Sequence, residues 1–183
     1  MTKIILFISA FVPMYILFLL NLIMELMNDN LTMNITNTCV LIGLIFLTLL
    51  GTVGLLGIIK NKGKEYKTVT ILSKKNLTDQ HFLNYFSLFV LLALTFDLSK
   101  IALVCVFVVI LVFIGIVYIR NNIYYVNPLL NILGYSFYDI EYKSGEQIKE
   151  LRIFYKGELE VGDVEYKAYI ASRNLNFLEK IHK

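Results

Sequence analysis

The sequence predicts a mainly helical membrane protein, with a bundle of about four transmembrane helices followed by a small β-rich cytoplasmic domain. Three observations lead to this fold class. Of the 183 residues, 57% are hydrophobic and 17% are charged, whereas soluble domains have about half and about a quarter. The apolar residues gather in four long runs separated by polar loops. The last third of the chain instead alternates between apolar and polar residues, which is typical of half-buried strands.

The first apolar run, Ile4 to Met24, predicts a retained transmembrane helix. A signal peptide is the competing interpretation, because Lys3 could supply its positively charged start. The run is longer than the apolar part of a signal peptide, and no small-residue cleavage pattern follows it. Pro13 lies inside the run and should kink the helix, because proline lacks the N–H that the preceding turn needs.

The other three runs differ in length. Cys39 to Ile59 and Ile101 to Ile119 are each about long enough to cross ~30 Å of hydrocarbon at ~1.5 Å per residue. Phe82 to Phe96 is shorter and spans only if the polar residues that flank it lie at the interfaces. A re-entrant hairpin therefore stays open as the alternative for this third run.

The basic residues of the loops predict the orientation, since cytoplasmic loops carry an excess of Lys and Arg. The loop from Glu25 to Thr38 contains neither, and Arg120 closes the fourth run. The loop between the second and third runs is rich in lysine, at Lys60, Lys62, Lys64, Lys67, Lys74 and Lys75. The sequence thus predicts a multi-pass protein of the bacterial inner membrane with both termini in the cytoplasm.

The segment after the fourth run begins with a short helix signal. Asn127-Pro128 is typical of a helix start, with Asn as the N-cap and Pro at the first helical position. Gly134 should end this helix after one turn. The predicted domains are therefore a transmembrane domain of residues 1–122 and a β-rich domain of residues 123–183.

Three strands are predicted in the β-rich domain. Period-two alternation occurs around Tyr138–Tyr142, Leu151–Tyr155 and Tyr166–Ile170. Three short strands bury little core, so this domain should lean on the membrane, on another subunit or on a partner. Aromatic residues are enriched at interfaces and open strand edges invite pairing. We therefore predict a partner contact at Tyr138, Tyr142, Phe154, Tyr155 and Tyr169.

Small and polar residues within the spans are the other candidate sites. Gly51, Gly54 and Gly57 recur every third residue, which predicts a helix-packing seam, with a hinge or gate as the alternative. Asn84 and Ser87 are three residues apart and share one helix face. Hydrogen bonding between helices is their ordinary role, and lining a pore is the alternative.

Catalytic and ligand-binding motifs are absent from the sequence. Cys39 and Cys105 lie inside apolar runs, as thiols do that pack as small hydrophobes. A net charge of +3 is too slight to indicate direct nucleic-acid binding. We therefore predict a protein that is not an enzyme and that binds no cofactor or metal.

The chain from the third run through Ile119-Arg120, and then Tyr124-Tyr125-Val126-Asn127-Pro128-Leu129-Leu130-Asn131-Ile132-Leu133-Gly134-Tyr135, resembles the KwaA family, the membrane subunits of the Kiwa anti-phage defence system. Proteins of this family are about this long and carry four predicted spans. They pass through an Asn-Pro-x-Leu-x-x-Leu-Gly-[Phe/Tyr]-like segment into a short β-rich cytoplasmic tail. The architecture is shared over the whole chain, and the local motif covers about twenty residues.

The resemblance implies a homo-oligomer, a tetramer, that acts as a membrane sensor or scaffold in bacterial anti-phage defence. It also implies a cytoplasmic partner that binds DNA and blocks phage replication and transcription. The family offers no catalytic residues to carry over. Two other functions stay open from the residues alone: a small pore-forming effector or channel, and an immunity-type protein that occupies a toxin's target in the membrane.

Overall fold

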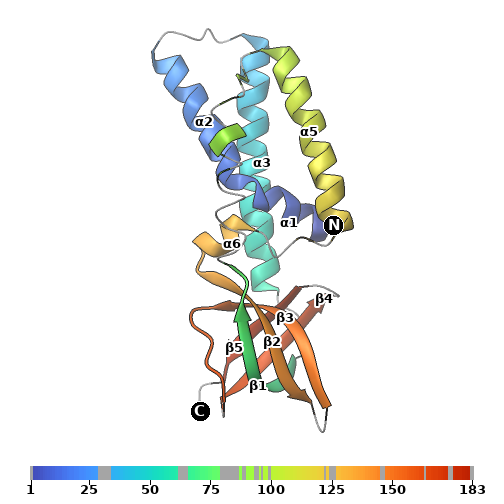
Figure 1. Cartoon of the computed structure of the whole chain (residues 1–183). Coiled ribbons are helices and arrows are strands. Elements are labelled where there is room, and N and C mark those ends of the chain that lie inside the picture. Colours follow the sequence, from blue (N-terminus) through green and yellow to red (C-terminus); the bar gives the residue numbers. More distant parts are fainter. Residues whose placement is uncertain are drawn as a thin grey trace. The chain divides into compact units, whose positions relative to one another are not determined.

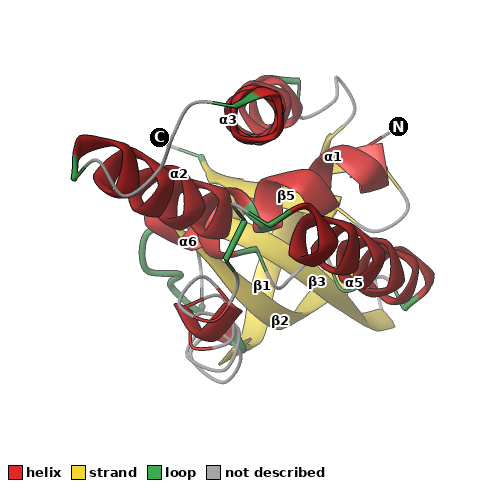
Figure 2. Ribbon diagram, turned by 90° about the horizontal axis from the view of Figure 1, so that it is seen from above, coloured by secondary structure: helices red, strands yellow, loops and turns green. Residues whose placement is uncertain are grey.

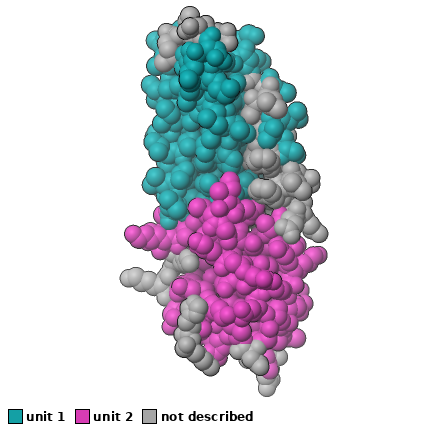
Figure 3. Space-filling model, turned by 90° about the vertical axis from the view of Figure 1, so that its left-hand side faces the viewer, with its two compact units in different colours: residues 1–56, 83–129 teal, residues 57–82, 130–183 magenta. Residues whose placement is uncertain are grey.

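The computed structural model describes residues 2–28, 34–61, 66–78, 87, 90–92, 95, 97–98, 100–121, 123, 127–144, 147–162, 164–172 and 175–181. The chain divides into two compact units (Figures 1 and 3). The first unit contains residues 1–56 and 83–129, and the second contains residues 57–82 and 130–183. The division differs from the predicted boundary at residue 122, because part of the basic loop belongs with the C-terminal strands.

The described helices of the first unit are α1 (Thr2–Ala10), α2 (Val12–Met27), α3 (Ile35–Lys60), whose last turn belongs to the second unit, and α5 (Ile101–Arg120). The first two are one apolar helix broken by a bend of 46°. The break falls at Phe11, just before Pro13, so the predicted kink is confirmed.

Among the described residues, α3 and α5 are each long and apolar enough to cross a membrane. The bent pair of α1 and α2 passes the same test of length and composition when it is counted as one broken span. The third predicted span, Phe82 to Phe96, lies largely outside the described residues.

The second unit is a closed barrel of five strands. The strands are β1 (Tyr66–Asn76), β2 (Tyr135–Ser144), β3 (Gln147–Lys156), β4 (Glu165–Ser172) and β5 (Leu175–Lys180). Their order around the barrel is β1-β2-β3-β5-β4, and β3 with β5 is the parallel pair. The three predicted strands are confirmed as β2, β3 and β4. The prediction of open edges was wrong, because two further strands close the sheet.

Strand β1 comes from the basic loop between the second and third apolar runs. It pairs with β2 on one side and with β4 on the other, with Tyr66 opposite Tyr169 and Thr70 opposite Lys143. Its inward residues Val69 and Ile71 are buried. The barrel core consists of Val69, Ile71, Tyr138, Ile140, Ile153, Leu159, Tyr166, Ala168 and Leu178.

The short helix between the units has the predicted signals. It is α6 (Pro128–Ile132), and the Asn127 side-chain oxygen accepts a hydrogen bond from the Leu129 N–H at 3.1 Å. Gly134 follows with a φ of 82°, which only glycine adopts freely. The predicted N-cap and the predicted stop are both confirmed.

Candidate functional site

A buried polar cluster lies at the break of the first helix. Ser9 is fully buried, and its hydroxyl donates to the Leu6 carbonyl at 2.9 Å. The Asn127 side-chain NH2 donates to the Ser9 hydroxyl at 2.7 Å and lies 3.4 Å from the Leu6 carbonyl. A buried polar group without a partner costs about 1–3 kcal/mol. The amide of Asn127 is thus well suited to a break whose backbone groups lie away from water.

The two polar atoms of the Asn127 side chain have different partners. Its NH2 group binds the helix break, while its oxygen caps the first turn of α6 through Leu129. It is the last buried polar residue among the described residues of the helical unit, and the chain enters the barrel soon after it. Asn127 thus connects the helix break to the first turn of α6.

Glycines bring α3 and α5 close to α1, which lies between them when the unit is seen from the end (Figure 2). A Cβ added at Gly51 would lie 2.6 Å from the Val12 side chain, and one at Gly54 would lie 2.5 Å from the Ile5 side chain. On the other side, a Cβ at Gly115 would lie 3.1 Å from the Phe7 ring. Helix α1 is therefore approached closely by α3 on one side and by α5 on the other.

The three seam glycines do not behave alike. Gly51 and Gly54 face α1 of the same chain, whereas nothing lies within 4 Å of a Cβ added at Gly57. Gly115 was not among the predicted site residues, because a single glycine in an apolar run has no sequence pattern that marks it.

The predicted polar face of the third span is only partly visible. Asn84 lies outside the described residues, and Ser87 is helical and exposed. Cys39 and Cys105 are free and exposed, where packed thiols were predicted. The reason is that α3 and α5 are apolar around most of their circumference and leave many such side chains uncovered.

The predicted aromatic contact residues divide into two groups. Tyr138 and Phe154 are 5% and 2% exposed and are therefore unavailable to a partner. Tyr138 belongs to the barrel core, whereas Phe154 lies on the opposite face of β3 and packs against the rings of Phe137 and Phe177. Tyr142 and Tyr155 are partly buried against the barrel core. This is a correction of the predicted contact surface. Closure of the sheet turns Tyr138 inward, and Phe154 is taken up by an aromatic cluster.

Tyr169 lies instead in an outward-facing aromatic pair. Its ring centroid is 5.9 Å from that of Tyr66, which is 52% exposed, and the Lys167 ammonium lies 5.0 Å from the Tyr66 ring centroid. Burial raises the pKa of the Tyr169 hydroxyl, and a hydrogen bond with the Glu179 side chain raises that pKa further. Both effects favour the neutral, protonated hydroxyl. Tyr66 escaped the sequence analysis because its segment was interpreted as a loop.

No group of three or more His, Cys, Asp or Glu side chains that could hold a metal occurs within the described ranges. The charged side chains of the barrel form local ion pairs, such as that of Lys180 with Glu160 at 2.7 Å.

Comparison with known proteins identifies the family. The chain matches the family described as anti-phage protein KwaA over residues 2–176. Comparison with the curated proteins and with the solved structures gives no match. The family match includes the helix break, Asn127 and most of the barrel, and it confirms the resemblance seen around Asn127-Pro128. Because the match covers nearly the whole chain, the chain belongs to the KwaA family of anti-phage proteins.

Proposed function

We propose that this chain is a non-enzymatic membrane sensor or scaffold of anti-phage defence that acts with a cytoplasmic, DNA-binding partner. The observation that carries the defence role is the KwaA family match over residues 2–176. The two long apolar helices support the placement in a membrane. The cluster of Ser9 and Asn127 supports a coupling role, because it links a break in an apolar helix to the chain that enters the barrel.

We also propose that the chain crosses the inner membrane four times, with both termini in the cytoplasm. The pairing of the barrel supports an even number of crossings between β1 and β2, because strands that pair must lie on one side of the membrane. Helix α5 supplies one crossing in this interval. A second crossing is then needed between Asn76 and Ile101, which is where the third span is predicted.

Reporter fusions test this topology. We expect a fusion after Lys183 and one within the loop between α3 and β1 to report the cytoplasm, and one at Asn34 to report the outside. Inside and outside signals of equal strength at one position would mean mixed topology. An outside signal after Lys183 would overturn the four-crossing proposal.

The outward pair of Tyr66 and Tyr169 is the part of the predicted contact that best suits a partner. Tyrosine is enriched at interfaces because it combines a large apolar surface with a hydroxyl, and Lys167 adds a positive charge beside it. We place the partner contact there. We also propose that the chain assembles into a homo-oligomer, a tetramer, as its resemblance to the KwaA family implies.

The test combines plaque counts with purification. In cells that carry the chain and its neighbouring genes, we expect the double variant Tyr66→Ala, Tyr169→Ala to remain in the membrane fraction. It should lose the co-purifying DNA-binding protein, and plaque counts should rise to those of cells that lack the gene. Ile148→Ala is the matched control, because Ile148 is 66% exposed on β3.

Two results would contradict the proposal. If deletion of the whole gene leaves plaque counts unchanged, the defence role fails. If liposomes that contain the purified protein release ions at a rate that tracks phage protection, the pore function replaces the scaffold function.

A further inference from the structure

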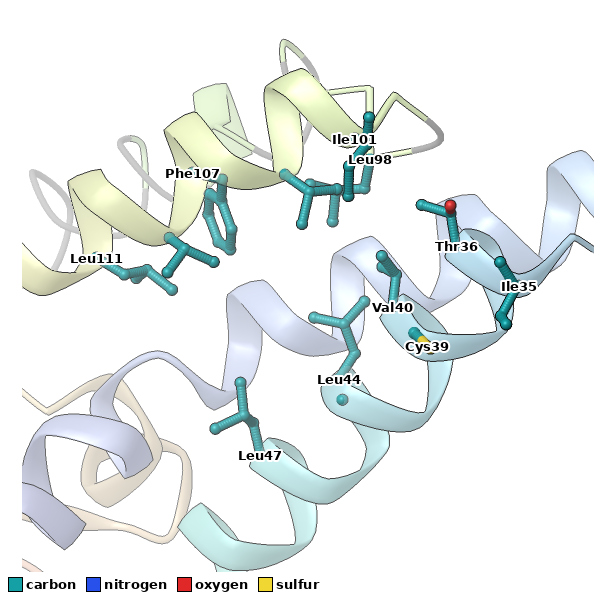
Figure 4. A pocket seen from close by; sticks show the side chains of 13 residues that line it. Ile35, Thr36, Cys39, Val40, Leu44, Leu47, Leu98, Ile101, Phe107 and Leu111 are labelled. Carbon is teal, nitrogen blue, oxygen red and sulfur yellow. The ribbon is translucent and has the colours of Figure 1, made fainter.

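An apolar groove runs between α3 and α5. Its first part is a cavity of about 420 Å³, lined by residues of α3 between Ile35 and Leu47 and residues of α5 between Ile101 and Leu111 (Figure 4). Its second part is a cavity of about 610 Å³, lined by α5 as far as Arg120, with Phe7 of α1 beside it. The two parts share the lining residues Leu47, Val108 and Leu111, so they adjoin along α5 and together are called the groove.

The groove ends at a cation. Arg120 is the last residue of α5 and the charged member of the second lining. Its side chain is exposed, and within the described part of the chain it forms no ion pair. The rest of the second lining is apolar. An apolar groove with a guanidinium at one end matches a ligand that has a long apolar body and an anionic head.

The length of the groove suits a lipid chain. From Val108 to Arg120 the groove follows α5 for about 18 Å at 1.5 Å per residue, close to the ~15 Å of one leaflet.

We infer that the groove binds an acyl chain of an anionic phospholipid of the cytoplasmic leaflet, and that the lipid phosphate pairs with Arg120. A guanidinium presents donors that match a phosphate in a bidentate manner. The apolar wall excludes water, so an acyl chain fills the groove where water would not. The inference rests on the membrane placement proposed above.

Native mass spectrometry of the protein released from nanodiscs tests the inference. The nanodiscs contain equal amounts of phosphatidylglycerol and phosphatidylcholine. We expect the protein to retain phosphatidylglycerol about fivefold over phosphatidylcholine, which is the preference that one basic residue near anionic headgroups supplies. Arg120→Gln should abolish this preference. Lys60→Gln is the control, because Lys60 ends α3 outside both linings.

A second pair of variants tests the groove itself. Val108 lines both cavities and is 51% exposed, whereas Val109 is 52% exposed and lines neither. We expect Val108→Phe to lower the retention of both lipids, because the ring occupies the groove. Val109→Phe adds the same ring outside the groove and should leave retention unchanged. Equal retention in the two variants would overturn the inference.

A competing occupant is a second copy of the chain. With Cys39→Ser and Cys105→Ser as the background, Val112→Cys places one thiol in the second cavity. Mild oxidation that joins two copies through this thiol would show that a neighbouring chain covers the groove, which overturns lipid binding there.

Carbonate extraction distinguishes failure of the proposed function from failure of this inference alone. Protein released from membranes contradicts the proposed function, whereas retained protein without lipid preference contradicts only this inference.

Discussion

Asn127 shows which part of a residue's role a sequence reveals. Its position before Pro128 predicts an N-cap, and the bond from the Leu129 N–H to its oxygen has that geometry. Its bond to Ser9 joins residues 118 positions apart, and no local pattern marks such a pair. Capping is a property of neighbouring residues and is predictable. Burial against a distant helix break depends on the tertiary packing.

We expect Asn127→Ala to lower the stability of the helical unit by about 1–3 kcal/mol, because it removes the cap and leaves the Ser9 hydroxyl with fewer partners. Ser9→Ala should cost less. The double variant should cost less than the sum of the two, since the residues share a hydrogen bond. Thermal unfolding of the purified protein in detergent measures these effects. Asn131→Ala is the control in the same short helix, and an equal loss there would remove any special role for Asn127.

Tyr166 is a second residue whose polar atom matters. It is fully buried, and its hydroxyl accepts a hydrogen bond from the Glu160 N–H at 3.0 Å and donates one to the Glu160 carbonyl at 3.2 Å. We expect Tyr166→Phe to lower barrel stability by about 1–2 kcal/mol. The unfolding temperature should fall by about 4–8 °C per kcal/mol. Tyr66→Phe, on an exposed ring, should shift it little.

At the scale of elements, the strands with clear alternation were predictable and β1 was not. The segment Tyr66 to Leu72 is rich in β-branched residues with period-two burial, which is a strand signal. Its lysines were instead interpreted as markers of membrane orientation. Lys74 in fact donates to the Leu159 carbonyl within the barrel. A lysine-rich segment can mark the cytoplasmic side and also form a strand, so lysine content alone does not distinguish a loop from a strand.

The glycines of α3 provide a graded test of helix packing. We expect Gly51→Leu to destabilise the helical unit strongly, because a Cβ there meets the Val12 side chain at 2.6 Å and the Ile8 carbonyl oxygen at 3.2 Å. Gly54→Leu should do the same through Ile5. Gly57→Leu is the matched control, because its Cβ would meet open space. The yield of monodisperse protein after detergent extraction measures the effect, and a Gly57 variant as impaired as the Gly51 variant would contradict this account.

At the scale of the whole molecule, the barrel is assembled from two separated parts of the chain. Strand β1 lies between α3 and α5, while its partners β2 and β4 follow α5. The predicted division into residues 1–122 and 123–183 could not include this arrangement, because pairing between distant strands leaves no sign in either segment. The family resemblance was recognisable because its motif is local.

A truncation follows from this arrangement. We expect a chain stopped after Asn122 to insert into the membrane but to accumulate poorly, because β1 then lacks both partner strands and exposes its edges. Replacing residues 66–76 with a Gly/Ser linker in the truncated chain should restore its level in the membrane fraction. Immunoblots of that fraction provide the measurement. A truncated chain that accumulates fully with β1 intact would contradict the role assigned to the missing partners.

The same connectivity sets the order of events during synthesis. Strand β1 is complete at Asn76, but β4, which covers one of its edges, begins at Glu165. At roughly 5–20 residues per second, a ribosome needs on the order of ten seconds to add the chain between them. During this time α5 is synthesised and β1 lacks its partner β4. The barrel can therefore close only after α5 and the strands that follow it have been made.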